Sequence, residues 1–121
     1  MGGGYQMEVS YPRTGRPGIG APVQIQLQHQ GGFQGPVTIS MSSDYLDILD
    51  VRTIVPEPNQ VTTSDKDVIW QFNQPPGDTL VVSISSEFEP DEHPGRHRAT
   101  IAVIDNGNPA VQAKLTTWES P

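Results

Sequence analysis

The chain has 121 residues, of which 34% are hydrophobic, and its net charge is −7. This length is close to the commonest size of a single domain, and the hydrophobic content can fill one modest core. Cysteine is absent, which excludes disulfides, thiolate metal sites and cysteine nucleophiles. No run of about 18 apolar residues occurs, so no part of the chain is expected to cross a membrane as a helix.

Acidic residues are concentrated in the middle of the chain. Between Met41 and Glu92 there are eleven acids and two bases, Arg52 and Lys66, so this stretch has a charge of −9. A protein that binds a phosphate backbone needs clustered Lys and Arg with aromatic or base-reading residues between them. Nucleic acid and anionic membranes are therefore poor partners.

The N-terminal region is predicted to contain one strand and one long loop. Residues 1–5 are interpreted as a flexible leader or a cloning remnant, because Met-Gly-Gly-Gly lacks the basic and apolar regions of a signal peptide. Residues 6–121 are predicted to form a single domain, and its first strand spans residues 6–11. Residues 12–22 are rich in Pro and Gly, which predicts a loop that crosses a sheet edge or switches sheets.

Two strands with a period of two follow this loop. From Val23 to Gln30, apolar residues and His29 alternate with four glutamines, as in a half-buried strand whose outer face is coated with glutamine. The glycine-rich stretch 31–35 leads to residues 37–41, where Val, Ile and Met alternate with Thr and Ser. The second strand is predicted to pair with the first.

The next segment, SSDYLDILDV, breaks the period of two. Its apolar residues take one side of a helical turn and its three aspartates the other, so a single amphipathic turn capped by Ser43 is predicted as a crossover. The apolar side holds Tyr45, Leu46, Ile48 and Leu49, and the acidic side holds Asp44, Asp47 and Asp50.

A strand is expected to resume at residues 51–55 and to stop at Pro56-Glu57-Pro58-Asn59. Residues 67–73 and 79–88 then show clean alternation, and Pro75-Pro76-Gly77-Asp78 between them predicts a hairpin corner. This corner is interpreted as structural, because two of its residues lack an N–H and it opens a strand, whereas a phosphate-binding loop opens a helix.

The clearest hairpin lies at the end of the chain. Residues 99–103 and 111–115 alternate, and Asp105-Asn106-Gly107-Asn108 lies between them. Asn-Gly tolerates the positive φ values that a tight hairpin turn requires.

About eight short strands without a long helix predict an antiparallel β-sandwich of the immunoglobulin-like type, with an eight-stranded barrel as the rival fold. The residues expected in its core are Ile25, Leu27, Ile39, Trp70, Phe72, Val82, Ile84, Ile101 and Leu115.

The strand VIWQF followed by QPPGDTLVVSI resembles the Trp-containing strand, Pro-Gly corner and apolar strand of immunoglobulin-like domains in bacterial surface and secreted proteins. The stretches MEVSYPRTGRPGIGAPVQIQL, GGFQGPVTIS and TTW resemble the extracytoplasmic domain of small membrane proteins of Gram-positive, actinobacterial type, which one N-terminal helix anchors. The resemblance implies a fold and an extracytoplasmic location. It brings no catalytic residues, and the missing Cys pair departs from antibody-type domains.

Metal binding is considered at two places and is not expected at either. His93 and His97 have an H-x₃-H spacing beside Glu92, but Pro94-Gly95 makes this segment a turn and a zinc site needs three or four ligands. Calcium needs six to eight converging oxygens, whereas the aspartates at 44, 47 and 50 are spread along one side of a helical turn. The turn at 105–108 is explained by backbone geometry alone.

Catalysis is not expected either, and neither is a cofactor. No serine lies in a G-x-S-x-G or S-x-x-K motif, and no nucleophile, base and orienting group are predicted to converge. Glu87, Glu89, Asp91 and Glu92 are candidates for a glycosidase carboxylate pair, but a small sandwich rarely offers a deep cleft.

Aromatic residues and the acidic turn are the candidates for an interaction surface. Trp118 lies on the opposite parity from Val111, Ala113 and Leu115, so it is exposed unless a bulge shifts it. With Tyr45 or Tyr11 it could form a stacking platform for sugar rings or a protein anchor. The alternative is a structural role, in which Trp118 covers the open end of the sandwich. The candidate surface consists of Tyr45, Trp118, Asp44, Asp47 and Asp50.

Three functions remain open from the sequence. The first is a non-catalytic, extracytoplasmic scaffold or protein-interaction domain of a membrane-anchored protein, whose partner is another protein or an envelope component. The second is a carbohydrate-binding module with exposed aromatics, and the third is an intracellular sandwich with an unrecognised ligand. The oligomeric state does not follow from the sequence.

Overall fold

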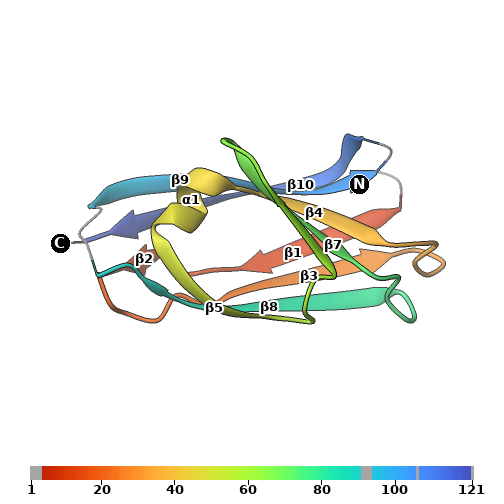
Figure 1. The fold of residues 1–121 in the computed structure, drawn as a ribbon, viewed down its shortest axis with the longest axis horizontal. Coiled ribbons are helices and arrows are strands. Elements are labelled where there is room, and N and C mark those ends of the chain that lie inside the picture. The colour runs from red at the N-terminus through yellow and green to blue at the C-terminus, as the bar shows by residue number, and fades with distance from the viewer. Residues whose placement is uncertain (1–3, 91–93, 106, 121) are drawn as a thin grey trace.

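Two β-sheets pack face to face in the computed structural model, which describes residues 4–90, 94–105 and 107–120 (Figure 1). The four-stranded sheet has the order β1-β3-β8-β5. Its strands are β1 (Tyr5–Ser10), β3 (Val23–His29), β8 (Thr79–Phe88) and β5 (Leu49–Val55).

The six-stranded sheet has the order β2-β10-β9-β4-β7-β6 and is antiparallel except for the pairing of β2 with β10. Its strands are β2 (Thr14–Gly15), β10 (Asn108–Glu119), β9 (Gly95–Asp105), β4 (Val37–Ser42), β7 (Asp67–Phe72) and β6 (Gln60–Thr63). One short helix, α1 (Ser43–Asp47), connects β4 to β5 and so carries the chain from one sheet to the other.

The core lies between the inner faces of the two sheets. All nine residues that the sequence predicts for the core are at least 97% buried, Trp70 among them at 3% exposure. Burial alternates along β3, so its glutamines coat the outer face of the four-stranded sheet as predicted. The predicted β-sandwich with a short helical crossover is thus confirmed.

Two of the predicted hairpins are wrong. The strands β3 and β4 lie in different sheets, and so do β7 and β8, because each connection is an arch between the sheets. Phe33 is buried in the first arch, and its N–H donates to the carbonyl of Gly77 in the second. Alternation and turn residues are the same in an arch and in a hairpin, so the sequence does not distinguish them. Pro75-Pro76-Gly77-Asp78 is a structural corner, as predicted.

The hairpin of β9 and β10 is confirmed. Asp105 pairs with Asn108, Gly107 has φ +79°, and the register shifts between Pro109 and Val111. Asn106 lies outside the described residues.

Helix α1 occupies the predicted turn, but its cap differs from the prediction. Ser42 precedes the helix and makes no capping hydrogen bond through its side chain. Ser43 is the first residue of the helix, and its hydroxyl donates to the carbonyl of Ser64 at 3.1 Å. This hydroxyl therefore attaches the helix to the turn between β6 and β7 and does not cap it.

Three further differences concern short elements. Tyr5 belongs to β1, and its ring packs at a tilt against that of His29 with centroids 4.4 Å apart, so it is not part of a leader. Strands β2 and β6 are not predicted, since two and four residues are too few for a periodic pattern. The predicted switch between sheets does occur in the loop after β1, which leads to β2 in the other sheet. No helix within the described part of the chain is long and apolar enough to span a membrane.

Candidate interaction surface

One long side of the sandwich lies between the edge strands β5 and β6, and we call it the open side. Strand β5 is the edge of the four-stranded sheet and β6 is the edge of the six-stranded sheet. They follow one another in the chain, with residues 56–59 between them. No strand of the described residues covers the gap between these two edges.

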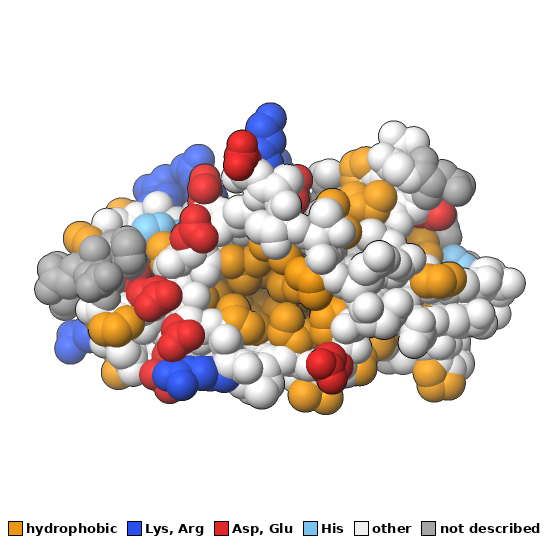
Figure 2. Space-filling model, in the orientation of Figure 1, with side chains coloured by type: hydrophobic (Ala, Val, Ile, Leu, Met, Phe, Trp, Pro, Cys, Tyr) orange, Lys and Arg blue, Asp and Glu red, His pale blue; other side chains and the backbone are white. Residues whose placement is uncertain are grey.

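The open side contains an apolar groove of about 560 Å³. Val55 is 62% exposed and Val61 is 54% exposed, which makes them the two most exposed large hydrophobic residues in this region. Figure 2 shows hydrophobic side chains gathered in a hollow at the centre of this view. The groove is lined by Val51, Arg52, Thr53, Ile54, Val55, Glu57, Pro58 and Val61.

Apart from its short length of four residues, the edge of β6 carries no residue that usually protects an edge against pairing. All four residues of this strand are exposed, and none of them is charged or a proline. The Ser64 N–H donates to the carbonyl of Asp67 at the turn, so antiparallel alternation directs the amide of Thr62 toward β7. The amides of Val61 and Thr63 then point away from the sheet and are free to pair with another strand.

An acidic band runs beside this groove. It consists of Asp44, Asp47, Asp50, Asp65, Asp67 and Glu87. The Ser43 N–H donates to the carbonyl of Lys66 at 2.8 Å, so α1 begins next to the acidic turn between β6 and β7. Arg52 pairs with Asp50 at 3.2 Å and with Glu87 at 3.8 Å, where α1 leads into β5. Figure 2 shows most of the carboxylates of this view beside the hydrophobic hollow.

The three predicted aspartates are therefore at the surface, but Tyr45 is not. Asp44 and Asp47 are exposed, and Asp50 is half-buried in its pair with Arg52. Tyr45 is only 1% exposed, because the helix directs its apolar side into the core. Its assignment to an interaction surface is wrong.

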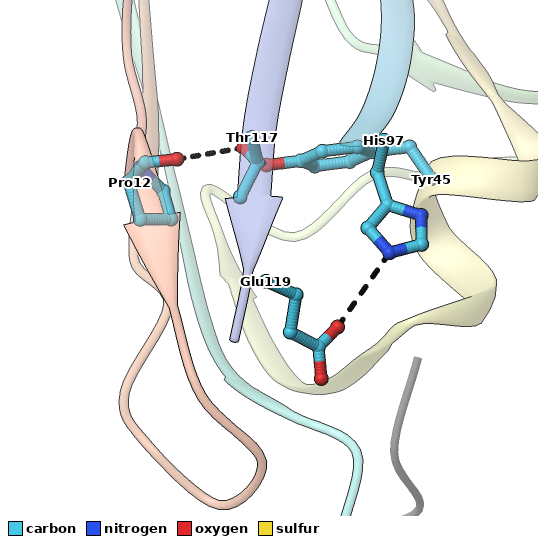
Figure 3. A network of polar contacts seen from close by, with 5 residues as sticks. All are labelled: Pro12, Tyr45, His97, Thr117 and Glu119. Carbon is cyan, nitrogen blue, oxygen red and sulfur yellow. Dashed lines mark hydrogen bonds and ion pairs between the residues drawn. The ribbon is translucent and has the colours of Figure 1, made fainter. Parts of the chain in front are cut away.

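Tyr45 belongs to a buried polar contact that joins distant segments (Figure 3). Its hydroxyl lies 2.7 Å from the Thr117 hydroxyl, which donates to the carbonyl of Pro12 at 2.6 Å. Since Thr117 has one hydroxyl proton, Tyr45 is the donor in the first bond. Burial raises the pKa of Tyr45 above its ordinary value of 10.0.

Trp118 is 51% exposed, as its parity on β10 predicts. It follows Thr117 on the strand, so its side chain points to the outer face of the six-stranded sheet. Tyr45 lies under the inner face of that sheet, where it meets Thr117. The structure therefore does not bring Tyr45 and Trp118 together as a platform.

The buried carboxylate of Glu119 is the one described group whose side-chain oxygens are buried without a hydrogen bond. Its Oε1 lies 3.7 Å from Nε2 of His97 (Figure 3). A zinc site needs a third or fourth ligand, and no group of three potential ligands gathers within the described residues. Glu92 and His93 of the H-x₃-H segment, and Asp91, lie outside the described residues.

The sequence predicts the acidic part of this surface and misses the apolar part. Val55 is the last residue of a predicted strand, and Val61 stands alone among polar residues, so neither forms a pattern. The positions of β5 and β6 at the sheet edges follow from the order of the strands in the two sheets, and the sequence does not give this order.

No protein-family model and no curated protein matches the chain. The chain is similar in structure to the CARDB domain of a Pyrococcus furiosus protein in complex with di-metal ions, with a TM-score of 0.55 and 11% identity. That likeness covers 95% of this chain and 91% of that one. A second likeness, to β-glucosidase from Listeria innocua, has a TM-score of 0.51 and 11% identity, and covers 95% of this chain but only 16% of the glucosidase. These likenesses support the immunoglobulin-like sandwich and do not extend beyond the fold.

Proposed function

We propose that this chain is a non-catalytic domain that binds another protein on the outer side of the cell membrane, as part of a membrane-anchored protein. The observation that carries the proposal is the groove between β5 and β6, in which Val55 and Val61 are exposed beside the acidic band. Exposed apolar surface with a polar rim is typical of protein-interaction sites. The proposed location rests on the resemblance to anchored extracytoplasmic domains, and the absence of cysteine is compatible with it.

The mode of binding is the addition of a strand to β6. The outward amides and carbonyls of β6 are available for backbone pairing, which supplies affinity in this type of recognition. Val61 pairs with Trp70 in the sheet, so its side chain faces the same way as that core residue and overhangs the groove. An added strand would cover it.

The partner segment is expected to be extended and to carry Lys or Arg. The acidic band holds six carboxylates, and the only bases next to them in the sequence are Arg52 and Lys66. Opposite charge at the rim of an interface raises the association rate and fixes orientation. Apolar residues alternating with these bases would rest on Val55 and Val61.

A platform of two stacked aromatics for neutral sugars has less support. Tyr45 is buried, and the guanidinium of Arg96 lies 5.2 Å from the centre of the Trp118 ring, over one of its faces. Sugar stacking would have to use the remaining face.

Binding by strand addition is tested with a synthetic nine-residue peptide of alternating Val and Lys, and a matched peptide of alternating Val and Glu. We expect the Lys peptide to shift the backbone NMR signals of residues 60–63 and 65–67, and the Glu peptide to leave them unchanged. Val61→Pro removes an outward amide, whereas Val61→Ala removes only apolar contact. We expect the proline variant to bind at least about tenfold more weakly than the alanine variant. Equal binding by the two variants, or shifts mapping elsewhere, would overturn strand addition.

The location is tested separately in intact cells that carry the full-length protein. Ser85 is exposed on the outer face of β8, and the chain has no cysteine, so Ser85→Cys introduces a single reactive thiol into this domain. A maleimide that does not cross membranes should label this variant more strongly than the parent protein. Labelling that occurs only after lysis would contradict the extracytoplasmic location.

A further inference from the structure

Four bases gather at the opposite edge of the six-stranded sheet from β6, and we call them the basic cluster. They are Arg13, Arg96, Arg98 and Lys114. Arg96 pairs with Trp118 across β9 and β10, and Arg98 pairs with Thr116. Arg13 precedes β2, whose Thr14 pairs with Trp118. A chain with a net charge of −7 thus places four of its seven bases at one end of one face.

Two of these arginines are held against aromatic rings. The guanidinium of Arg96 lies 5.2 Å from the centre of the Trp118 ring, and that of Arg13 lies 5.7 Å from the centre of the Tyr11 ring. The backbone N–H of Trp118 donates to the carbonyl of Arg13 at 2.9 Å. This bond holds the two arginine–aromatic pairs beside each other. Stacking immobilises a guanidinium but leaves its in-plane donors available for a carboxylate or phosphate.

The basic cluster is not neutralised by the carboxylates that the structure describes. Among the described residues, the bases that form ion pairs are Arg52 and His97, and neither of them belongs to the basic cluster. Glu119 lies on β10 next to Trp118 but points into the interior. By register the nearest carboxylate on this outer face is Asp67, which lies beyond Ser42 and Thr100. Cations that no described carboxylate pairs, on a protein with an acidic net charge, favour an anionic ligand.

A groove of about 470 Å³ continues from the cluster along the outer face of the sheet. Lys114 pairs with Thr100 across it, and Arg98 pairs with Thr116, so each base stands next to a hydroxyl. Its lining consists of Ser42, Arg98, Ala99, Thr100, Lys114, Leu115 and Thr116. The cations and hydroxyls of this groove match the carboxylates and hydroxyls of a charged sugar chain.

We propose that the basic cluster and this groove bind an anionic polysaccharide that carries about one carboxylate per disaccharide. A nucleic acid carries one phosphate per nucleotide, and its affinity comes mainly from the charges it neutralises. The acidic band of this chain repels so dense a polymer more strongly than a sparsely charged one. Single-stranded nucleic acid also stacks successive bases on free aromatic faces, whereas Trp118 and Tyr11 each have an arginine over one face.

The test uses hyaluronan oligosaccharides of eight to ten sugars as the probe, because they alternate glucuronate with N-acetylglucosamine. Binding is followed by titration calorimetry and by tryptophan fluorescence, since Trp118 is exposed while Trp70 is buried. The neutral control is an N-acetylglucosamine hexamer, and the dense polyanion is an oligothymidylate of the same length as the oligosaccharide. We expect hyaluronan to bind with a fluorescence change and to weaken as salt is raised from about 50 to 200 mM.

Variants separate this site from a general charge effect. The double variant Arg96→Gln, Arg98→Gln should bind the oligosaccharide at least about tenfold more weakly. Arg52→Gln, on the open side, removes one positive charge elsewhere and should leave binding unchanged, and melting curves check that both variants are folded. Equal binding of the hexamer, tighter binding of the oligothymidylate, or equal weakening by Arg52→Gln would each overturn the proposal. Because the peptide test concerns the groove at β6, the two proposals can fail independently.

Discussion

The two long sides of this sandwich are built differently. On the side of β1 and β10, which we call the closed side, residues 11–15 cross from one sheet to the other. Backbone bonds fix this segment to β10 and its end, from Trp118 to Arg13 at 2.9 Å and from Ser120 to Gly15 at 2.8 Å. On the open side, the connection between β5 and β6 crosses from sheet to sheet, and exposed Val55 and Val61 flank the groove.

This difference separates what the protein needs for folding from what it offers to a partner. The closed side combines apolar packing with the buried hydrogen bonds of Tyr45, Thr117 and Pro12, although the carboxylate of Glu119 on the same side is buried without a hydrogen bond. The open side leaves a short strand edge beside apolar surface, and this edge lacks the charge, proline or bulge with which natural proteins often block pairing. Strand β5 does carry a bulge between Val51 and Thr53 and an ion pair, so the exposed edge is confined to β6.

The largest loss of stability is expected in the core, which both sides of the sandwich enclose. Trp70 is 3% exposed and lies opposite Val61, so Trp70→Ala should lower the free energy of unfolding by about 3–5 kcal/mol. Trp118→Ala is the matched control, because this indole is 51% exposed and loses mainly its contact with Arg96, so it should cost only about 1 kcal/mol. Chemical denaturation measures both. Equal losses for the two variants would remove the distinction between core and surface aromatics.

The next effect concerns the closed side alone. A Cβ atom added at Gly15 would overlap the ring of Phe88, so Gly15→Ala forces the crossing segment away from the core. We expect a loss of about 1–3 kcal/mol, as for other overpacked sites.

Gly20→Ala provides the control for this substitution. An added Cβ at Gly20 meets no atom within 4 Å, so stability should stay within about 0.5 kcal/mol of the parent. If both alanine variants melt with the parent, the crossing segment does not contribute to closing this side.

The comparison of the two sides also shows how far the sequence predicts this molecule. The alternation in residues 23–30, 67–73 and 79–88 identifies the strands and the core, because a half-buried strand requires that period. The alternation does not show which strands pair with each other, since an arch and a hairpin have the same period and the same turn residues. The long hairpin was predicted correctly because Asn-Gly is specific for a two-residue turn.

The candidate sites were predictable to a lesser degree. The aspartates of the acidic band are visible in the sequence as a charge run, and the exposure of Trp118 follows from parity. Tyr45 was misplaced because a single helical turn does not show how deeply its apolar side is inserted. The basic cluster draws on residue 13 and on residues 96–114, which only the pairing of β2, β9 and β10 brings together.

A smaller effect is expected from the buried hydroxyl on the closed side. Tyr45→Phe removes the bond to Thr117, which keeps its own bond to Pro12, so the loss should be about 1 kcal/mol. Thr117→Val removes both bonds and should cost more, about 1–3 kcal/mol, because it leaves Tyr45 and the carbonyl of Pro12 unpaired. A larger loss for the tyrosine variant than for the threonine variant would contradict this assignment of donor and acceptor.

The same tyrosine makes stability depend on pH. Because burial raises the pKa of Tyr45 in the folded state, its contribution is fully present below pH 10.0, the ordinary pKa, and is lost as pH rises through the folded value. Stability of the parent should therefore fall above that pH, and more steeply than that of Tyr45→Phe. Burial also raises the pKa of Tyr5, so the variant should keep part of the slope. Parallel curves for the two proteins would show that Tyr45 ionises equally easily in both states.

The smallest effect is expected on the open side, and it decides whether that side is a binding surface or a weak part of the core. Val55 and Val61 are 62% and 54% exposed, so replacing either with Thr removes little buried apolar area. Val55→Thr and Val61→Thr should each change the free energy of unfolding by no more than about 0.5 kcal/mol, because threonine keeps the β-branched shape that suits a strand. Both substitutions should nevertheless weaken binding of the Val-Lys peptide, since an added strand would bury the exposed side chains. A loss of stability like that of Gly15→Ala would show that the two valines stabilise the free protein. The contrast between the open and the closed side would then be wrong.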